Sequence, residues 1–193
     1  MKKRKLGTKV IILMVIFSLL IIVSTCIAVV VRYREDALER SRGQAFAYAK
    51  TAAAYIDGDR IEGYLTTLQK DEYYEQVENF LNASQDYSDL KYYYVYVPYE
   101  DDLVYIWDAN EEEGACELGD HEDYMKGGKE VSFAAFRKEP EERALVSMDE
   151  TYGFITSVVA PVYNSNGDPV ALVGVDISMP GVWPSIAKFI FSA

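Results

Sequence analysis

The first strong pattern along the chain is a run of apolar residues without a charge, VIILMVIFSLLIIVSTCIAVVV, at positions 10–31. These 22 residues would form a helix of about 33 Å at about 1.5 Å per residue, which spans a hydrocarbon core of about 30 Å. The run is longer than the apolar region of a cleaved signal peptide, and no small-x-small site precedes Arg32. We therefore expect residues 10–31 to be a transmembrane signal anchor that is not cleaved.

A helical pattern continues directly after this run, because no proline or paired glycine interrupts residues 33–56. Its seam has alternating spacings of three and four, and half of its members are small. The seam residues are Leu38, Ser41, Ala45, Tyr48, Ala52 and Tyr55. Small residues allow two helices to approach closely, so the pattern predicts a homodimer through the 33–56 helix. The alternative is that the same stripe packs on the sheet of its own domain.

The long helix is expected to end at Asp57-Gly58-Asp59, where a glycine lies between two turn-forming acids. Asp59 is placed to cap a short helix over residues 60–67. Asp71 is placed to cap another over residues 72–81.

Two later segments change to the pattern of β-strands. KYYYVYVPY at 91–99 and LVYIWDA at 103–109 are aromatic and β-branched runs joined by Glu-Asp-Asp, which predicts a hairpin. FITSVVAPVY at 154–163 and PVALVGVDI at 169–177 flank Asn166-Gly167, a pair that favours a tight hairpin turn.

Residues 110–150 between the two hairpins are acidic, rich in glycine and without a clear period. We expect one helix within them, around 139–147. Helices grouped first and antiparallel strands afterwards predict an α+β fold, with the long helix packed on an antiparallel sheet.

Charge predicts how the chain is oriented. Five basic residues and no acid precede the apolar run, so the positive-inside rule makes residues 1–9 a cytoplasmic basic tail. The following part, from residue 32, would be extracytoplasmic at the cell membrane. It has 14 basic residues against 31 acidic ones, a net charge of −17. Nucleic acid is not an expected partner at this charge, because phosphate binding needs a basic surface.

The sequence offers little support for catalysis. Cys26 lies in the apolar run and Cys116 lies outside it, so the two are not expected to pair. The only histidine, His121, is in an acidic loop with no second histidine, which argues against a catalytic zinc site. There is no phosphate loop, dinucleotide motif or nucleophile motif. We expect no enzyme activity, no cofactor and no metal site.

A carboxylate at the end of an apolar strand is the strongest candidate for chemistry. Alternation places Leu172, Gly174 and Asp176 on one face of the strand. A buried, unpaired charge costs several kcal/mol, so Asp176 needs a donor from the protein or from a ligand. Gly174 is expected to leave empty space beside it. Asp108, directly after Trp107, ends its strand in the same way, and the two acids outline a possible pocket.

These segments together resemble the extracellular Cache domains of bacterial transmembrane receptors. The resemblance covers about residues 33–178 and lies in the long helix, YYYVYV…LVYIWDA, ELG, TYG and above all APVYNSNGDPVALVGVDIS. It implies a PAS-like sheet with a small-molecule pocket on one face. Carried onto this chain, the resemblance makes Tyr94, Tyr96, Trp107, Asp108, Tyr152 and Asp176 the ligand-binding positions. Tyr105 is added on spacing, since it is expected to share a face with Trp107.

The amino-acid-binding branch of that family uses an arginine, and none lies between Arg60 and Arg137. A cationic or neutral ligand therefore suits this acidic domain better. The favoured hypothesis is a Cache-like sensor domain at 32–178 of a membrane receptor, of chemoreceptor, histidine kinase or cyclic-dinucleotide enzyme type. Residues 179–193 would begin a truncated returning helix. The alternative is an anchored, acidic module that binds another protein and no small ligand.

Overall fold

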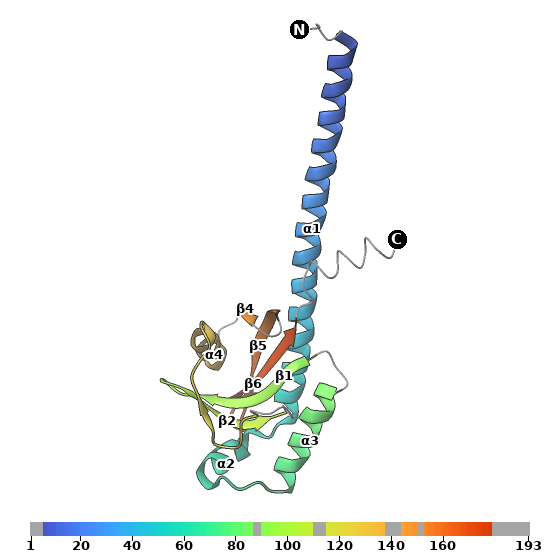
Figure 1. The fold of residues 1–193 in the computed structure, drawn as a ribbon. Helices are drawn as coiled ribbons and strands as arrows, with labels where there is room; N and C mark the ends of the chain where they lie inside the picture. The colour runs from blue at the N-terminus through green and yellow to red at the C-terminus, as the bar shows by residue number, and fades with distance from the viewer. Residues whose placement is uncertain (1–5, 87–89, 110–114, 138–143, 150–152, 179–193) are drawn as a thin grey trace. The chain divides into compact units, whose positions relative to one another are not determined.

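The computed structural model describes residues 6–86, 90–109, 115–137, 144–149 and 153–178 (Figure 1). The chain divides into two compact units, Met1–Glu39 and Arg40–Ala193. The helix α1, Leu6–Tyr55, begins in the first unit and ends in the second. The predicted continuation of the helix beyond the apolar run is therefore confirmed.

The described residues of the first unit form a helix with an apolar, exposed surface. Within α1, an 18-residue window has a mean hydropathy of 3.1, and none of it is buried. Ser18 and Thr25, two polar residues of the apolar run, donate hydrogen bonds to the carbonyls of Met14 and Ile21 one turn earlier. Their hydroxyls are thus satisfied without water. By length and composition this helix can cross a membrane.

The second unit is built around a six-stranded antiparallel sheet in the order β3-β2-β1-β6-β5-β4. The first and last long strands along the chain, β1 and β6, are therefore neighbours near its centre. The strands are β1 (Leu90–Pro98), β2 (Leu103–Asp108), β3 (His121–Glu122), β4 (Ala144–Asp149), β5 (Gly153–Tyr163) and β6 (Pro169–Ser178).

Both predicted hairpins are confirmed, β1 with β2 and β5 with β6. In the second, Gly167 has a φ of 79°, a conformation that glycine adopts without strain. Asn164 Oδ1 accepts hydrogen bonds from the backbone nitrogens of Asn166 and Asp168 and holds the turn.

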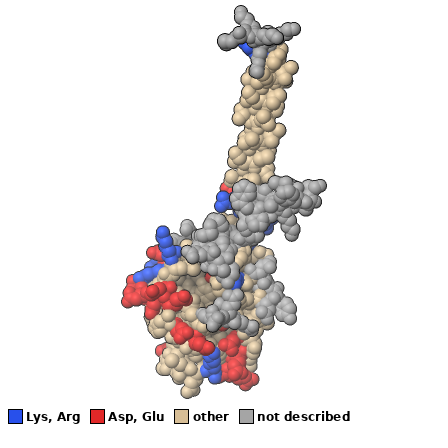
Figure 2. Space-filling view, viewed as in Figure 1, with Lys and Arg blue, Asp and Glu red and all other residues tan. Residues whose placement is uncertain are grey.

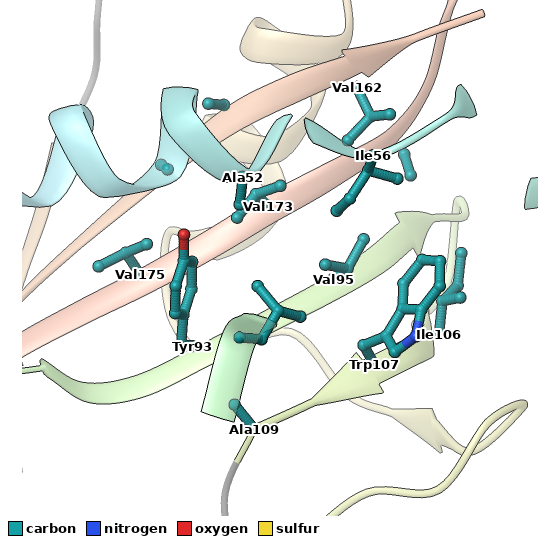
Figure 3. Packing of buried hydrophobic residues seen from close by; sticks show 14 of the residues in the cluster. Ala52, Ile56, Tyr93, Val95, Ile106, Trp107, Ala109, Val162, Val173 and Val175 are labelled. Carbon is teal, nitrogen blue, oxygen red and sulfur yellow. The ribbon is translucent and has the colours of Figure 1, made fainter. Parts of the chain in front are cut away.

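The end of α1 packs on one face of this sheet (Figure 3). Ala45, Ala49 and Ala52 have no exposed surface, so these small side chains allow the helix to lie close to the strands. Tyr93 on β1 donates its hydroxyl to the carbonyl of Tyr48 on α1, at 2.8 Å. Two seam residues, Ala45 and Ala52, are thus buried within their own unit, as the alternative interpretation of the seam expected.

The same face is completed by two further helices, α2 (Ile61–Thr67) and α3 (Glu72–Asp86). Asp71 Oδ1 accepts a hydrogen bond from the backbone nitrogen of Tyr74, so the predicted cap of α3 is confirmed. Tyr74 in turn donates its hydroxyl to the carbonyl of Ile106 on β2, at 2.6 Å. Its ring stacks on Trp107 at a centroid distance of 5.0 Å.

The opposite face of the sheet is covered by one described helix, α4 (Gly128–Phe136). Ala135 and Phe136 of α4 pack against a small cluster that contains Tyr96, Tyr105 and Leu172. This second face is where polar and apolar groups meet.

Two local expectations are wrong. The helix expected around 139–147 is absent from the described part of that range, where residues 144–149 form β4; the helix lies earlier, as α4. Residues 144–149 pair with β5 in the sheet, and these backbone hydrogen bonds outweigh the local preference for a helix. The capping residue after α1 is Asp57, which accepts from the backbone nitrogen of Asp59 and starts a 3₁₀ turn, η1 (Gly58–Arg60). Asp59 instead accepts from the backbone nitrogen of Ser165, at 2.9 Å.

The contact between η1 and the β5–β6 turn gives a stability prediction. A Cβ atom on Gly58 would overlap the carbonyl of Tyr163 and lie 2.9 Å from the backbone nitrogen of Asn164. Backbone atoms cannot rotate away, so we expect Gly58→Ala to destabilise the second unit by about 1–3 kcal/mol. Urea unfolding followed by tryptophan fluorescence measures this.

The matched control is Gly63→Ala on the exposed surface of α2, where an added Cβ meets nothing within 4 Å. Alanine favours the helix there by about 1 kcal/mol. Equal effects of the two alanine substitutions would contradict a tight contact at Gly58.

Candidate ligand pocket on the α4 face of the sheet

A pocket of about 100 Å³ opens between the sheet and α4, on the face opposite α1. Its wall on the sheet side comes from β1, β2, β4 and β5, and its other wall comes from residues 122–132. The main polar groups at the pocket are Tyr94, Tyr96, Tyr105, Glu122, Asp123, Tyr124, Ser132 and Ser157. Among the described lining residues there is no lysine, arginine or histidine. The pocket is therefore acidic and rich in hydroxyl groups.

Hydrogen bonds fix two of its tyrosines. Tyr96 Oη lies 2.7 Å from Ser132 Oγ on α4, and Tyr105 donates to Glu122 Oε2 at 2.7 Å. Burial raises the pKa of both phenols, so they stay neutral donors and acceptors. The first pair joins β1 to α4, and the second joins β2 to β3 within the sheet.

Asp176 lies beside this pocket at the end of β6. It is 4% exposed, and its Oδ1 has no hydrogen-bond partner among the described atoms. Its pKa is raised from 3.8 to about 7, chiefly because burial disfavours the charged form. Across the strand pair Asp176 faces Ser157. The nearby Ser157 hydroxyl opposes the rise in the Asp176 pKa, but the two side chains are not placed to form a hydrogen bond. The site therefore contains two buried oxygens that can receive a donor.

The ring of Tyr94 lies over Gly174, two residues before Asp176 on β6. A Cβ atom on Gly174 would overlap Cε2 of this ring and lie 2.9 Å from its hydroxyl oxygen. The expectation that Gly174 leaves empty space is therefore wrong, because Tyr94 on the neighbouring strand fills that space. Tyr94 also lines the pocket, whereas Asp176 is not among its described lining residues. Burial and then the nearby Asp176 raise the pKa of this phenol.

Trp107 does not share a face with Tyr105, contrary to the spacing argument. The β1–β2 register shifts between Val95 and Tyr96, so that Ile106 is an extra residue in β2. After this bulge Trp107 points to the α1 side, where it is 1% exposed (Figure 3). Its Nε1 donates to the carbonyl of Tyr74 at 3.1 Å. It is part of the hydrophobic core and not of this pocket.

The remaining predicted positions divide into two kinds. Asp108 is opposite Tyr94 in the register, and its Oδ2 accepts from the backbone nitrogen of Cys116 at 3.0 Å. It anchors the start of the described segment after β2 and does not line the pocket. Tyr152 lies outside the described residues.

Several residues at the site escaped the sequence analysis. Ser157 is paired with Asp176 across β5 and β6, where a regular count from the observed pair Tyr163–Pro169 would place Thr156. A register shift between Val162 and Tyr163 moves the pairing by one residue. Ser132 and Glu122 come from the segment without a clear period, so no sequence signal placed them against the strands. Only an acidic stretch near His121 hinted at polar chemistry there.

Possible metal ligands do not gather in the described part of the chain, where no group of three or more His, Cys, Asp or Glu residues is positioned to hold a metal ion. His121 Nδ1 instead pairs with Asp102 Oδ2 at 2.6 Å, at an exposed edge of the sheet. Cys116 is a free thiol whose pKa is raised to about 11 by burial, which makes it unreactive at neutral pH.

Comparison with known proteins gives matches among solved structures only. No protein-family model matches the chain, and no curated protein matches it. The chain is similar to the ligand-binding domain of the Campylobacter jejuni chemoreceptor Tlp3 in complex with 4-methylisoleucine, with 12% identity over 77% of this chain and 58% of that one, at a TM-score of 0.36. It is also similar to the same domain in complex with L-valine, with 12% identity over 79% and 61% and a TM-score of 0.34.

A third similar structure is the sensory domain of that receptor with isoleucine bound, with 13% identity over 79% of this chain and 61% of that one, at a TM-score of 0.34. The chain thus spans about three fifths of the length of these structures. They are ligand-binding and sensory domains of a chemoreceptor. The α+β class of this chain rests on its own helices and antiparallel sheet.

Proposed function

We propose that the second unit is a sensor domain that binds a small molecule with an ammonium or another hydrogen-donating group, and that Asp176 receives this group. The observation that supports this most is the buried Asp176 Oδ1 without a partner beside a pocket. A carboxyl group in this state gains a hydrogen bond and loses its unpaired charge when a cation binds. Ser157 adds a second oxygen at the same place.

The ligand we propose is small and is cationic or neutral. A pocket of about 100 Å³ is well below the roughly 300–1,000 Å³ of sites for drug-sized ligands. Its described lining has no basic side chain to hold a carboxylate. On the face seen in Figure 2, acidic side chains also outnumber basic ones over the second unit. These features support a compact amine more than an acid.

Signalling would use the direct connection between the pocket and α1. Tyr94 faces the pocket, and its neighbour Tyr93 on the same strand donates to the carbonyl of Tyr48 on α1. A ligand that displaces the Tyr94 ring would shift β1, and with it this hydrogen bond. The ligand must bind one arrangement of β1 and α1 more tightly than the other, because equal affinity for both would change nothing.

Membrane anchoring by residues 10–31, with the N-terminus in the cytoplasm and the sensor outside, belongs to the same proposal. It is supported by the long apolar helix and the basic residues before it. A homodimer through residues 33–56 remains a prediction. Because Ala45 and Ala52 are buried in their own unit, a partner helix would have to contact other positions.

The alternative is an anchored module that binds a protein and no small ligand. It expects a filled sheet face with its tyrosines exposed. Tyr96 and Tyr105 are instead buried beside the pocket, which favours the sensor.

Gly174→Ala tests the proposed function through the shape of the pocket. The new methyl group would push the Tyr94 ring toward the pocket, so we expect binding of small amines to weaken by about tenfold or more. A panel of short primary amines and diamines, titrated calorimetrically into the full chain in detergent micelles, measures this. The double variant Gly174→Ala/Tyr94→Leu should recover binding, since the shorter side chain restores space.

The matched control is Gly63→Ala, which adds a methyl group on exposed α2 and should bind like the wild type. If no amine in the panel binds the wild-type chain, or if Gly174→Ala binds as tightly as wild type, the proposed site is wrong.

A further inference from the structure

A second hollow lies at the edge of the sheet, on the side of α2. It is an open groove of about 550 Å³, larger than the pocket on the α4 face, and the two share no lining residue. We name it the Leu68 groove. Its described lining residues are Leu65, Leu68, Tyr99, Glu100, Asp101, Asp102, Val104, Gly119 and His121. Val104 and His121 line this groove, whereas their neighbours Leu103 and Glu122 line the pocket, because successive strand residues point to opposite faces.

The groove has an apolar part that is unusually exposed for this unit. Leu68 is 57% exposed and Tyr99 is 46% exposed. Leu68 ends α2 in the left-handed region, with a φ of 53°, where leucine is rare. Its side chain contacts the position of Gly119, where a Cβ atom would lie 2.7 Å from Leu68 Cδ2. A strained backbone thus holds a large apolar side chain at the surface, where a glycine would be the unstrained choice.

The rim of the groove is acidic. Three successive carboxylates, Glu100, Asp101 and Asp102, form the β1–β2 turn beside the apolar floor. Lys129 pairs with Glu100 at 2.8 Å, and His121 lies 2.6 Å from Asp102, so these two acids already have partners in the unit. Asp101 is exposed at the same rim. The charge that complements such a surface is positive.

We propose that the Leu68 groove docks a segment of another protein in which an apolar side chain is flanked by lysine or arginine. The apolar side chain would cover Leu65, Leu68 and Val104, and its basic neighbours would face the turn at residues 100–102. A segment of this kind fits an open groove of about 550 Å³ better than a small cation does, because a small cation would leave the apolar floor wet. This surface acts independently of the small-ligand pocket.

Leu68→Gly separates a docking role from a structural one. Glycine suits a φ of 53° and removes the apolar side chain, so we expect the melting temperature to be unchanged or higher while docking falls by about tenfold. The probe is a fluorescein-labelled synthetic peptide with leucines placed between lysine pairs, titrated into the full chain in detergent micelles and read by fluorescence anisotropy. A peptide with glutamate for each lysine should not bind.

A charge variant completes the test. Asp101→Lys should weaken docking of the lysine–leucine peptide severalfold, whereas Glu75→Lys, the same charge change on the exposed side of α3, should leave docking unchanged. Equal losses from both charge variants, or full binding by Leu68→Gly, would overturn the proposal. Complete displacement of the lysine–leucine peptide by spermine would also overturn the proposal, because it would show that the groove binds a small cation.

Discussion

Asp176→Asn is expected to stabilise the second unit at alkaline pH and to abolish binding of the amine, two effects in opposite directions. The folded protein binds the Asp176 proton more tightly than the unfolded chain, because the carboxyl pKa rises from 3.8 to about 7 on folding. The stability that this proton contributes is complete below pH about 4 and is lost as the pH rises through about 7. At about 1.4 kcal/mol for each pKa unit, the loss amounts to about 4 kcal/mol.

Urea unfolding of the wild-type chain and of Asp176→Asn at pH 4, 6 and 8 measures this difference. The neutral amide removes the loss, so the variant should gain stability over wild type as pH rises, by up to about 4 kcal/mol at pH 8. Asp101→Asn, on the exposed turn, should show no such gain. An Asp176→Asn chain that is less stable than wild type at pH 8 would show that the carboxylate has a partner in the folded protein.

The loss of binding in the same variant ties stability to function. A buried acid without a partner is costly to the fold unless a ligand supplies one, which is a common reason for a binding site to reduce stability. The amine panel described for Gly174→Ala should therefore bind wild type more tightly at pH 8 than at pH 5. At pH 5 the carboxyl group is largely protonated and does not attract a cation.

Trp107→Ala is expected to give the largest loss of stability, about 3–5 kcal/mol, without a change in the affinity of folded molecules for ligand. The indole is 1% exposed, stacks on Tyr74 and donates to its carbonyl, all on the face opposite the pocket. Truncation leaves a cavity under α2 and α3 and a break in their contact with β2.

Differential scanning calorimetry measures the stability, and amine titration at a temperature well below unfolding measures the affinity.

Tyr105→Phe is the matched variant on the pocket side. It removes the hydrogen bond to Glu122 and should alter binding more than stability. If a Trp107→Phe chain stays fully folded but no longer binds the amine, Trp107 belongs to the ligand site and this assignment is wrong.

The difference between these tryptophan and tyrosine variants comes from one extra residue in β2. Strict alternation from Tyr105 assigns Trp107 to the pocket face, and the bulge at Ile106 reverses that assignment. A second register shift lies between Val162 and Tyr163, and it brings Ser157 opposite Asp176 where a regular count from the pair Tyr163–Pro169 would bring Thr156. A bulge depends on how two strands pair, and neither strand alone contains a sufficient signal for it.

The sequence by itself determined the elements whose signals are local. The uncharged run at 10–31 and the unbroken helical pattern after it define α1, and Asp71 defines the start of α3, since a cap acts within one turn. Asn166-Gly167 defines the second hairpin, and period-two patterns define the four strands of the two hairpins. Each of these signals depends only on residues close together in the chain, and the α+β class follows from the order of the elements.

The tertiary structure decided which residues meet. β1 lies beside β6, so Tyr94 covers Gly174 and borders Asp176 although these two residues lie 80 and 82 positions further along the chain. Likewise α4 and Glu122 reach the pocket from a segment without a period, through contacts with Tyr96 and Tyr105. Long-range pairing and packing set these neighbours, because burial energy depends on the whole assembled sheet and not on any single stretch of sequence.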